Sequence, residues 1–270
     1  DFLTALFTST SATCVTGLVV TNTYLHWSLF GQIIIITLIQ IGGLGFITFG
    51  FEFSMFLRKK ITLRQRGLLK ESVNVVNTGG IVRLARLILQ GTLLFEGIGA
   101  LILTLCFLRD MPFSQALYYG IFHSISAFCN AGFDLMGAFG MSSFIGYNTN
   151  WIVCITLMAL IFIGGIGFFV WGDLKEHKLH IRKYALHTKI VLITSLILII
   201  GPSILFLILE RHALFADMNT PQAILNALFC AVTPRTAGFN TTDIASLSQS
   251  SQLLTIILMF IGGCPGSTAG

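Results

Sequence analysis

Charged side chains are scarce in this sequence. Asp, Glu, Lys and Arg together make up 10% of its 270 residues, whereas hydrophobic residues make up 54%. A soluble domain typically carries about 25% charged residues. This deficit excludes an ordinary soluble globular protein and indicates an integral membrane protein. The length allows about five or six spanning segments, because each needs about 20 apolar residues.

Paired cysteines are also lacking, since no two of the cysteines form a CxxC pair. The six cysteines are scattered through apolar segments, without the clustered spacing of a zinc site or a disulfide framework. We therefore interpret them as small apolar packing residues. An initiator Met and a signal peptide are missing as well. Because the chain begins and ends inside the repeat units described below, we expect it to be a fragment.

The few positive charges are concentrated in two places. Eight of the sixteen Lys and Arg residues lie within 58–86, and five more lie within 173–189. Short loops rich in Lys and Arg remain in the cytoplasm. The basic loops are therefore a topology signal, and the expected partner of the chain is the lipid bilayer rather than a nucleic acid.

Three apolar segments are too short to cross a bilayer and alternate with longer ones. The charge topology requires 112–132 to enter and leave from the outer side, because only one span fits between Arg109 and the inner loop 173–189. Irregular backbone at membrane depth is tolerated only beside protein or a water-filled cavity. We therefore expect re-entrant helices around a shared cavity. The short segments are 2–13, 112–128 and 221–232; the long ones are 27–57, 83–108, 151–171, 190–209 and the start of a span at 253–270.

Each short segment ends in a turn with glycine at its tip. These glycines, Gly17, Gly132 and Gly238, lie 115 and 106 residues apart, and a second glycine-rich landmark follows each of them, at 41–45, 163–167 and 261–266. Two landmarks in the same order indicate a long-period internal repeat. Its unit is a span, a re-entrant helix, a turn and a second span. Three such units leave a gap around an axis, so we expect a fourth in the intact protein.

A glycine in each turn suits a pore for cations. Rings of backbone carbonyls replace the water of an ion in a selectivity filter, and glycine reaches positive φ without a steric penalty. The short helices would also point their negative C-terminal ends at the ion. One copy alone would fit an ordinary glycine-capped turn, but three matched copies favour the filter.

The last landmark differs from its two counterparts. Pro265 and Gly266 interrupt a helix there, and small residues follow at 267–269. A kinked helix is the simpler interpretation. The more specific interpretation is an unwound loop at mid-membrane, which would gate the path of the ion. Two acidic residues in or near spans, Glu52 and Glu96, are also functional candidates. Glu96 fits equally a structural partner of a polar group and a role beside the path.

Four motifs carry a resemblance to a known family: 11–18 (SATCVTGL), 126–134 (SAFCNAGFD), 233–241 (TPRTAGFNT) and 262–270 (GGCPGSTAG). Over essentially its whole length, the sequence resembles the membrane subunit of a bacterial Ktr-type potassium uptake system, within the Trk/Ktr/HKT superfamily of potassium transporters. The resemblance implies an all-α integral membrane fold of span–pore helix–span units around a pseudo-fourfold pore. Repeat 1 is expected at 1–60, repeat 2 at 83–172 and repeat 3 at 188–270, with cytoplasmic loops at 61–82 and 173–187.

The resemblance also implies a role for individual residues. Potassium would bind at the filter residues Cys14, Val15, Thr16, Gly17, Cys129, Asn130, Ala131, Gly132, Arg235, Thr236, Ala237 and Gly238. The gating loop would comprise Gly262, Gly263, Pro265, Gly266, Ser267, Thr268, Ala269 and Gly270. The family's fourth repeat, with its filter glycine and a cationic residue facing the loop, is missing here, so this part alone should not conduct selectively.

The implied function is potassium uptake by a multi-pass protein of the cell membrane, not enzymatic catalysis. Potassium is the implied substrate and sodium a candidate activator, with no covalent cofactor. The implied partners are a second copy in a homodimer and a cytosolic ring of nucleotide-binding regulatory subunits. Alternatives are a Trk-type subunit and a carrier-type cation symporter with broken helices. A carrier would have inverted repeats, whereas these repeats run in one orientation. A membrane enzyme using Glu96 and a histidine lacks any paired catalytic spacing.

Overall fold

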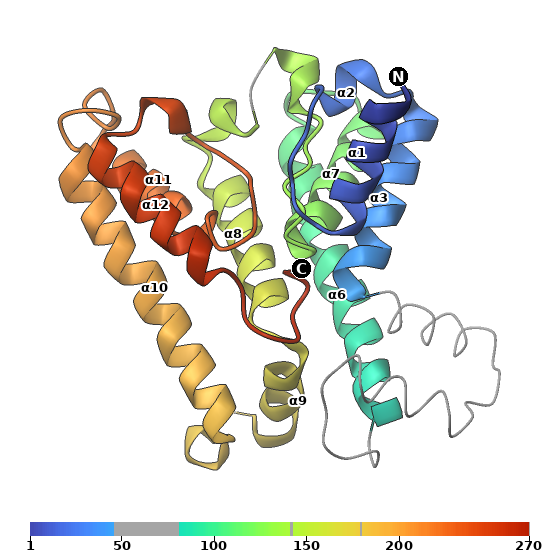
Figure 1. Cartoon of the computed structure of the whole chain (residues 1–270), viewed down its shortest axis with the longest axis vertical. Coiled ribbons are helices and arrows are strands. Elements are labelled where there is room, and N and C mark those ends of the chain that lie inside the picture. Colours follow the sequence, from blue (N-terminus) through green and yellow to red (C-terminus); the bar gives the residue numbers. More distant parts are fainter. Residues whose placement is uncertain (46–80, 141–142, 179, 270) are drawn as a thin grey trace.

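A computed structural model describes residues 1–45, 81–140, 143–178 and 180–269 of the chain. These residues contain helices and no strand. Glu52, Gly270 and most of the first basic loop lie outside the described residues. In Figure 1, α1 and α3 lie on one side of the molecule and α10, α11 and α12 on the other, with α6, α7 and α8 between them.

The first unit contains α1 (Phe2–Thr13), α2 (Thr23–His26) and α3 (Leu29–Leu44). The side chain of Asn22 caps α2 by accepting hydrogen bonds from the backbone N–H groups of Tyr24 and Leu25 at 3.0 and 3.1 Å. The Ser28 hydroxyl caps α3 in the same way. Such caps satisfy the first N–H groups of a helix, which have no partner within it. α1 packs against α3, and α3 ends at Leu44, followed by the cap residue Gly45, which has a φ of 80°.

The second unit contains α6 (Ile81–Phe107), α7 (Phe113–Phe128), α8 (Trp151–Gly165) and α9 (Phe168–His177), with short 3₁₀ turns η1 (Met136–Phe139) and η2 (Ile145–Tyr147) between α7 and α8. The short helix α7 packs against α3, α6 and α8 and is mostly buried. The third unit contains η3 (Ile181–Lys183), α10 (Leu186–Glu210), α11 (Thr220–Val232), η4 (Ile244–Ser246) and α12 (Gln249–Ile261).

Among the described residues, two helices are long and apolar enough to cross a bilayer, Arg83–Phe107 and Leu186–Glu210, and α8 with α9 makes a third if the pair is one bent span. The pair bends by 94° between Gly165 and Phe168. The break falls at the predicted landmark 163–167, where Gly167 has a φ of 94°. Apolar side chains remain exposed along α10, including those of Ile193, Ile197 and Ile204. An apolar surface of this kind fits contact with lipid.

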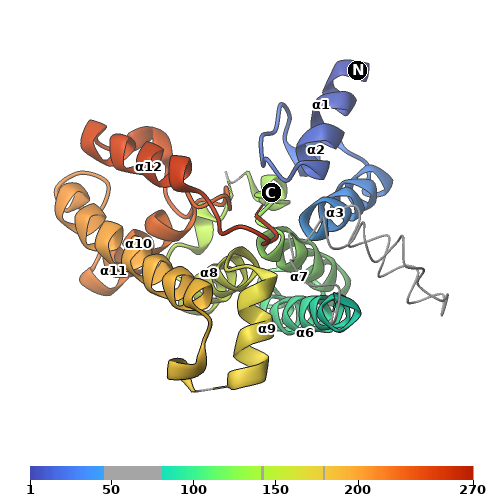
Figure 2. The same cartoon turned by 60° about the horizontal axis from the view of Figure 1, so that its bottom comes forward.

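The chain after α12 crosses the middle of the molecule. Both views show this segment running from the end of α12 toward α7 (Figures 1 and 2). α12 itself has 13 residues, so it rises about 20 Å, which is short of a bilayer core of about 30 Å. The fold therefore places an irregular segment below the ends of the short helices, where the glycine-tipped turns lie.

Candidate functional site

The three glycine-tipped turns share one backbone conformation. In each turn, the glycine and the residue two positions before it have positive φ: Gly17 and Val15 at 74° and 56°, Gly132 and Asn130 at 70° and 56°, and Gly238 and Thr236 at 82° and 74°. The sequence predicted the glycine, but it did not predict the left-handed residue before it. Residues with side chains disfavour the left-handed region. Because a non-glycine residue adopts it in all three turns, the surrounding structure must hold each turn in the same backbone path.

The three turns lie against one another. A Cβ atom added to Gly17 would lie 2.8 Å from the Ala131 carbonyl oxygen, and one added to Gly132 would lie 2.7 Å from the Ala237 carbonyl oxygen. At Gly238 the nearest atom would be the Cα of Gly132, at 3.2 Å. The fold therefore brings together glycines that are more than 100 residues apart in sequence, and only glycine fits at these contacts.

A hydroxyl group at the end of each short helix reaches across its turn. Ser11 Oγ donates to the Leu18 carbonyl and Ser126 Oγ to the Phe133 carbonyl, both at 2.7 Å. Thr233 Oγ1 donates to the Phe239 carbonyl in the third turn. We did not predict these hydroxyl groups as site residues. The sequence does carry a signal for them. A Ser lies six positions before the glycine in the first two turns, and a Thr lies five positions before it in the third.

The remaining predicted filter residues have different surroundings. Cys129 is buried beside Gln40 and Glu96, with Sγ 4.0 Å from the Glu96 carboxylate. The prediction that all cysteines pack in apolar surroundings is wrong for Cys14, which is exposed at the C-terminal end of α1. Asn130 is buried, and its side-chain amide has no hydrogen-bond partner among the described residues.

The glycine landmarks after the turns also mark close approaches. A Cβ atom on Gly42 would lie 2.0 Å from the Thr13 carbonyl oxygen, and one on Gly164 would lie 2.0 Å from the Phe128 carbonyl oxygen. Thr13 and Phe128 are the last residues of α1 and α7. Each landmark therefore lets α3 or α8 pass directly against the end of a short helix. In the third unit, Gly263 instead faces Ala269 of its own segment.

Residues 262–269 contain no helix, and we call them the intramembrane loop. Gly262 and Gly266 both have a φ of 66°. Backbone hydrogen bonds connect the loop to the corner between α8 and α9: Cys264 N–H donates to the Gly165 carbonyl at 3.1 Å, and Phe168 N–H donates to the Gly266 carbonyl at 2.8 Å. The loop therefore rests on the second unit.

One side chain attaches the intramembrane loop to the second short helix. Thr268 Oγ1 donates to the Phe128 carbonyl at 2.6 Å, and its own N–H donates to the Gly164 carbonyl at 3.2 Å. Phe128 ends α7, immediately before the second turn. Of the predicted loop residues, Thr268 is thus the one whose side chain bonds directly below that turn.

The chain that follows the second turn is fixed by buried polar groups. His123 Nε2 accepts a hydrogen bond from the Leu135 N–H at 3.0 Å, and Asp134 Oδ1 accepts one from the Met136 N–H at 2.9 Å. Burial raises the pKa of the Asp134 carboxyl to about 6. Nearby, Ser124 Oγ donates to the backbone carbonyl of Glu96 at 2.7 Å. Glu96 is buried within α6 at the back of α7, which leaves both of its predicted roles open.

Comparisons with known proteins identify the family of this chain. The model of the TrkH family, described as a cation transport protein, matches residues 1–270. The chain is 42% identical over 270 residues to the potassium/sodium uptake protein NtpJ of Enterococcus hirae, and 38% identical over 271 residues to the Ktr system potassium uptake protein B of Bacillus subtilis. Each alignment includes the whole chain, which spans 59% and 60% of these relatives.

The crystal structure of the potassium transporter TrkH from Vibrio parahaemolyticus has the same fold. Its TM-score with this structure is 0.72 at 20% sequence identity, covering 100% of this chain and 52% of that chain. This likeness confirms the all-α fold. The family model and the two relatives confirm the resemblance to the Trk/Ktr/HKT superfamily of membrane proteins. Because the family model matches every residue, this multi-pass membrane protein belongs to the TrkH family of cation transport proteins.

Proposed function

We propose that this chain forms most of a potassium-selective uptake pore in the cell membrane, with its three turns as three of four filter segments. The observation that carries the proposal is the contact of the three turns through Gly17, Gly132 and Gly238. Four span–pore helix–span units would complete the ring. The proposed repeats, 1–60, 83–172 and 188–270, each contain one short helix followed by one turn.

Selectivity would come from backbone carbonyls that replace the hydration shell of potassium. Three features support this role. The short helices α1, α7 and α11 all end at the turns, so the negative ends of their dipoles favour a cation. The left-handed positions hold each turn in the same path. The hydroxyl groups of Ser11, Ser126 and Thr233 bind the chain on the far side of the glycine, which limits collapse around a smaller ion.

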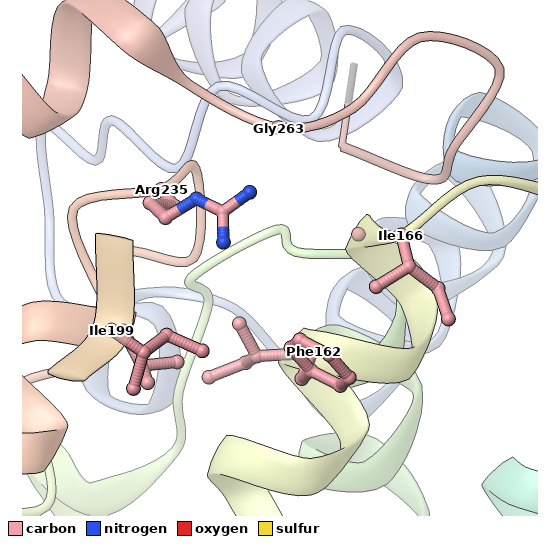
Figure 3. A pocket seen from close by; sticks show the side chains of 8 residues that line it. Phe162, Ile166, Ile199, Arg235 and Gly263 are labelled. Carbon is pink, nitrogen blue, oxygen red and sulfur yellow. The ribbon is translucent and has the colours of Figure 1, made fainter. Parts of the chain in front are cut away.

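Gating would come from the intramembrane loop. It is bonded to the ends of α7 and α8, directly below the second turn, and its irregular backbone is of the kind that lines cavities in membranes. Displacement of the loop would then open the path between the filter and the cytoplasm. In the predicted filter set, the backbone of 235–238 belongs to the third filter segment, whereas the side chain of Arg235 is turned toward the loop (Figure 3).

The partners are proposed on the same basis. The predicted basic loop 173–187 includes the last residues of α9, the link to α10 and the first residues of α10, and it exposes Arg182 and Lys183. It is a candidate docking site for a cytosolic nucleotide-binding ring, on which two copies of the membrane subunit would assemble. A Ktr-type rather than Trk-type subunit is supported by the 38% identity to the Bacillus subtilis protein. Sodium as an activator is supported by the name of the Enterococcus hirae relative.

Growth rescue tests the proposal. The complete protein, expressed in a bacterial strain that lacks its own potassium uptake systems, should restore growth at low external potassium, and cells should accumulate potassium in preference to sodium. Empty vector provides the baseline. A membrane enzyme would give no rescue. Failure of a correctly inserted protein to carry potassium, with or without sodium, would contradict the proposed function.

A further inference from the structure

Arg235 joins three parts of the third unit through one side chain. Its Nε donates to the Gly262 carbonyl at 3.3 Å, and its Nη2 donates to Ser195 Oγ in α10, also at 3.3 Å. The same nitrogen lies 3.8 Å from Cys264 Sγ. Figure 3 shows the guanidinium pointing from the third turn toward the backbone at Gly263. The third turn, α10 and the intramembrane loop therefore meet at this group.

The charge of Arg235 is satisfied in an unusual way. A guanidinium carries a permanent positive charge, and such a charge is costly inside a membrane unless it is paired. No described carboxylate lies within 4 Å of it; the ion pair found in the described ranges joins Asp173 to His177. Its principal acceptor is the carbonyl of Gly262, the cap residue that directly follows α12. The negative end of α12 thus provides the compensating charge.

The two ends of the intramembrane loop are held with different strength. Near its C-terminal end, the Thr268 hydroxyl bonds the Phe128 carbonyl at 2.6 Å in a buried position. At the α12 end, the Cys264 N–H bonds the Gly165 carbonyl at 3.1 Å and the contacts of Arg235 are 3.3 to 3.8 Å long, and hydrogen bonds weaken as they lengthen. The α12 end is therefore the end that is released more easily.

The surroundings of Arg235 leave room for that release. A cavity of about 10 Å³ lies beside the guanidinium, lined by Phe162, Ile166, Ile199 and Gly263 among others. This is close to the space that one water molecule needs. A water molecule there would replace an acceptor that the guanidinium loses when the loop moves. Gly262 and Gly266, both at positive φ, supply two positions at which the backbone can rotate.

We propose that Arg235 is a latch that holds the α12 end of the intramembrane loop against the third turn and α10, and that breaking its contacts with Gly262 and Cys264 releases the loop. The inference rests on the proposed function of the loop as a gate. Arg235 is a positioning residue in this scheme: it acts through the loop, while the backbone of its turn lines the filter.

The native thiol of Cys264 offers a direct reporter. In membranes containing the complete protein, the rate at which a maleimide alkylates Cys264 is measured by mass spectrometry of its peptide. Loss of the guanidinium in Arg235→Gln should raise this rate about tenfold, since a charged hydrogen-bond donor is removed. Potassium influx should rise as well, because the path below the filter would open more readily.

Three further variants make the result decisive. Arg235→Lys keeps the charge but not the forked geometry, so its alkylation rate should be intermediate. Ser195→Ala removes one acceptor of the guanidinium outside the turn, together with a hydroxyl that itself lies 3.8 Å from Cys264 Sγ, and should raise the rate about threefold. If Arg235→Gln fails to fold, the alkylation rate of Ser195→Ala tests the proposal in its place. Arg211→Gln, an exposed cation at the end of α10, is the control and should match wild type.

An alkylation rate within about twofold of wild type in folded Arg235→Gln, or in Ser195→Ala if the first variant does not fold, would overturn the latch. A change in ion preference without faster alkylation would also overturn it, because Arg235 would then act on the filter. The alkylation measurement needs no ion flux. A wild-type protein that carries no potassium would therefore refute the proposed function without deciding the latch.

Discussion

Replacing Gly132 by alanine tests whether the contact between turns sets ion preference. The added methyl carbon would lie 2.7 Å from the Ala237 carbonyl oxygen and 3.1 Å from the Gly238 Cα. Both neighbours are backbone atoms, so neither can rotate away as a flexible side chain would. The variant must therefore displace the third turn, the second turn or both.

The magnitude follows from comparison with Gly140, a glycine with nearly the same backbone conformation. Gly132 and Gly140 have φ values of 70° and 68°, so alanine costs roughly 1–2 kcal/mol of backbone strain at either position. A Cβ atom on Gly140 would meet no atom within 4 Å. Overpacking therefore applies to Gly132 alone and adds about 1–3 kcal/mol. If this overpacking energy weakens potassium binding at the filter, the preference for potassium over sodium drops about tenfold for every 1.4 kcal/mol.

The assay uses the complete protein reconstituted in liposomes, with potassium and sodium fluxes and the thermal unfolding midpoint measured for both variants. We expect Gly140→Ala to lose stability through strain but to retain the wild-type preference for potassium. Gly132→Ala should lose at least as much stability and about tenfold or more of its preference. The reasoning is refuted if Gly132→Ala discriminates as well as wild type, or if Gly140→Ala loses the preference equally.

Three further predictions concern the groups around the turns. Ser126→Ala should lower stability by about 1–3 kcal/mol in thermal unfolding, because it leaves the Phe133 carbonyl without its buried donor. The control, Ser246→Ala, removes an exposed hydroxyl bonded to the Asp243 carbonyl and should have little effect. Gly164→Ala should prevent recovery of monodisperse protein, because its Cβ would lie 2.0 Å from the Phe128 oxygen; Gly97→Ala, with no atom within 4 Å, should gain about 1 kcal/mol of helix stability instead. Burial raises the pKa of Asp134 from 3.8 to about 6, so the folded protein binds this proton more tightly than the unfolded chain and loses stability as pH rises through that interval. Asp134→Asn should therefore raise the unfolding midpoint at about pH 7 and leave it nearly unchanged at about pH 3, and equal effects at both pH values would contradict the assignment.

Much of the fold was predictable because the membrane restricts the choices. The expected short segments 112–128 and 221–232 correspond to α7 and α11, which begin one residue after Pro112 and one residue before Pro221. Lengths below a full span, proline near the first turn and a following glycine provide clear signals. The helix break at 163–167 was predictable for the same reason, since consecutive glycines weaken a helix and one of them reaches positive φ.

The contacts between repeats were not predictable from the sequence. Nothing in the composition shows that Gly132 lies against Ala237, because the approach depends on how separate helices pack. The left-handed conformation of Val15 runs against the preference of a β-branched residue, so tertiary contacts impose it. Arg235 was grouped with the filter by its position in the motif, yet its side-chain partners lie 27 and 40 residues away in sequence.

The contact between the first two turns has a consequence for synthesis of the protein. Gly17 meets Ala131, so the first turn acquires its neighbour only after more than 100 further residues have been added. At about 5–20 residues per second, this takes roughly 6–23 s. The second turn likewise waits for Ala237. During translation each turn is inserted before the backbone that fixes its shape exists, so the nascent chain acquires its ion preference late, as a property of the assembled repeats and not of any one of them.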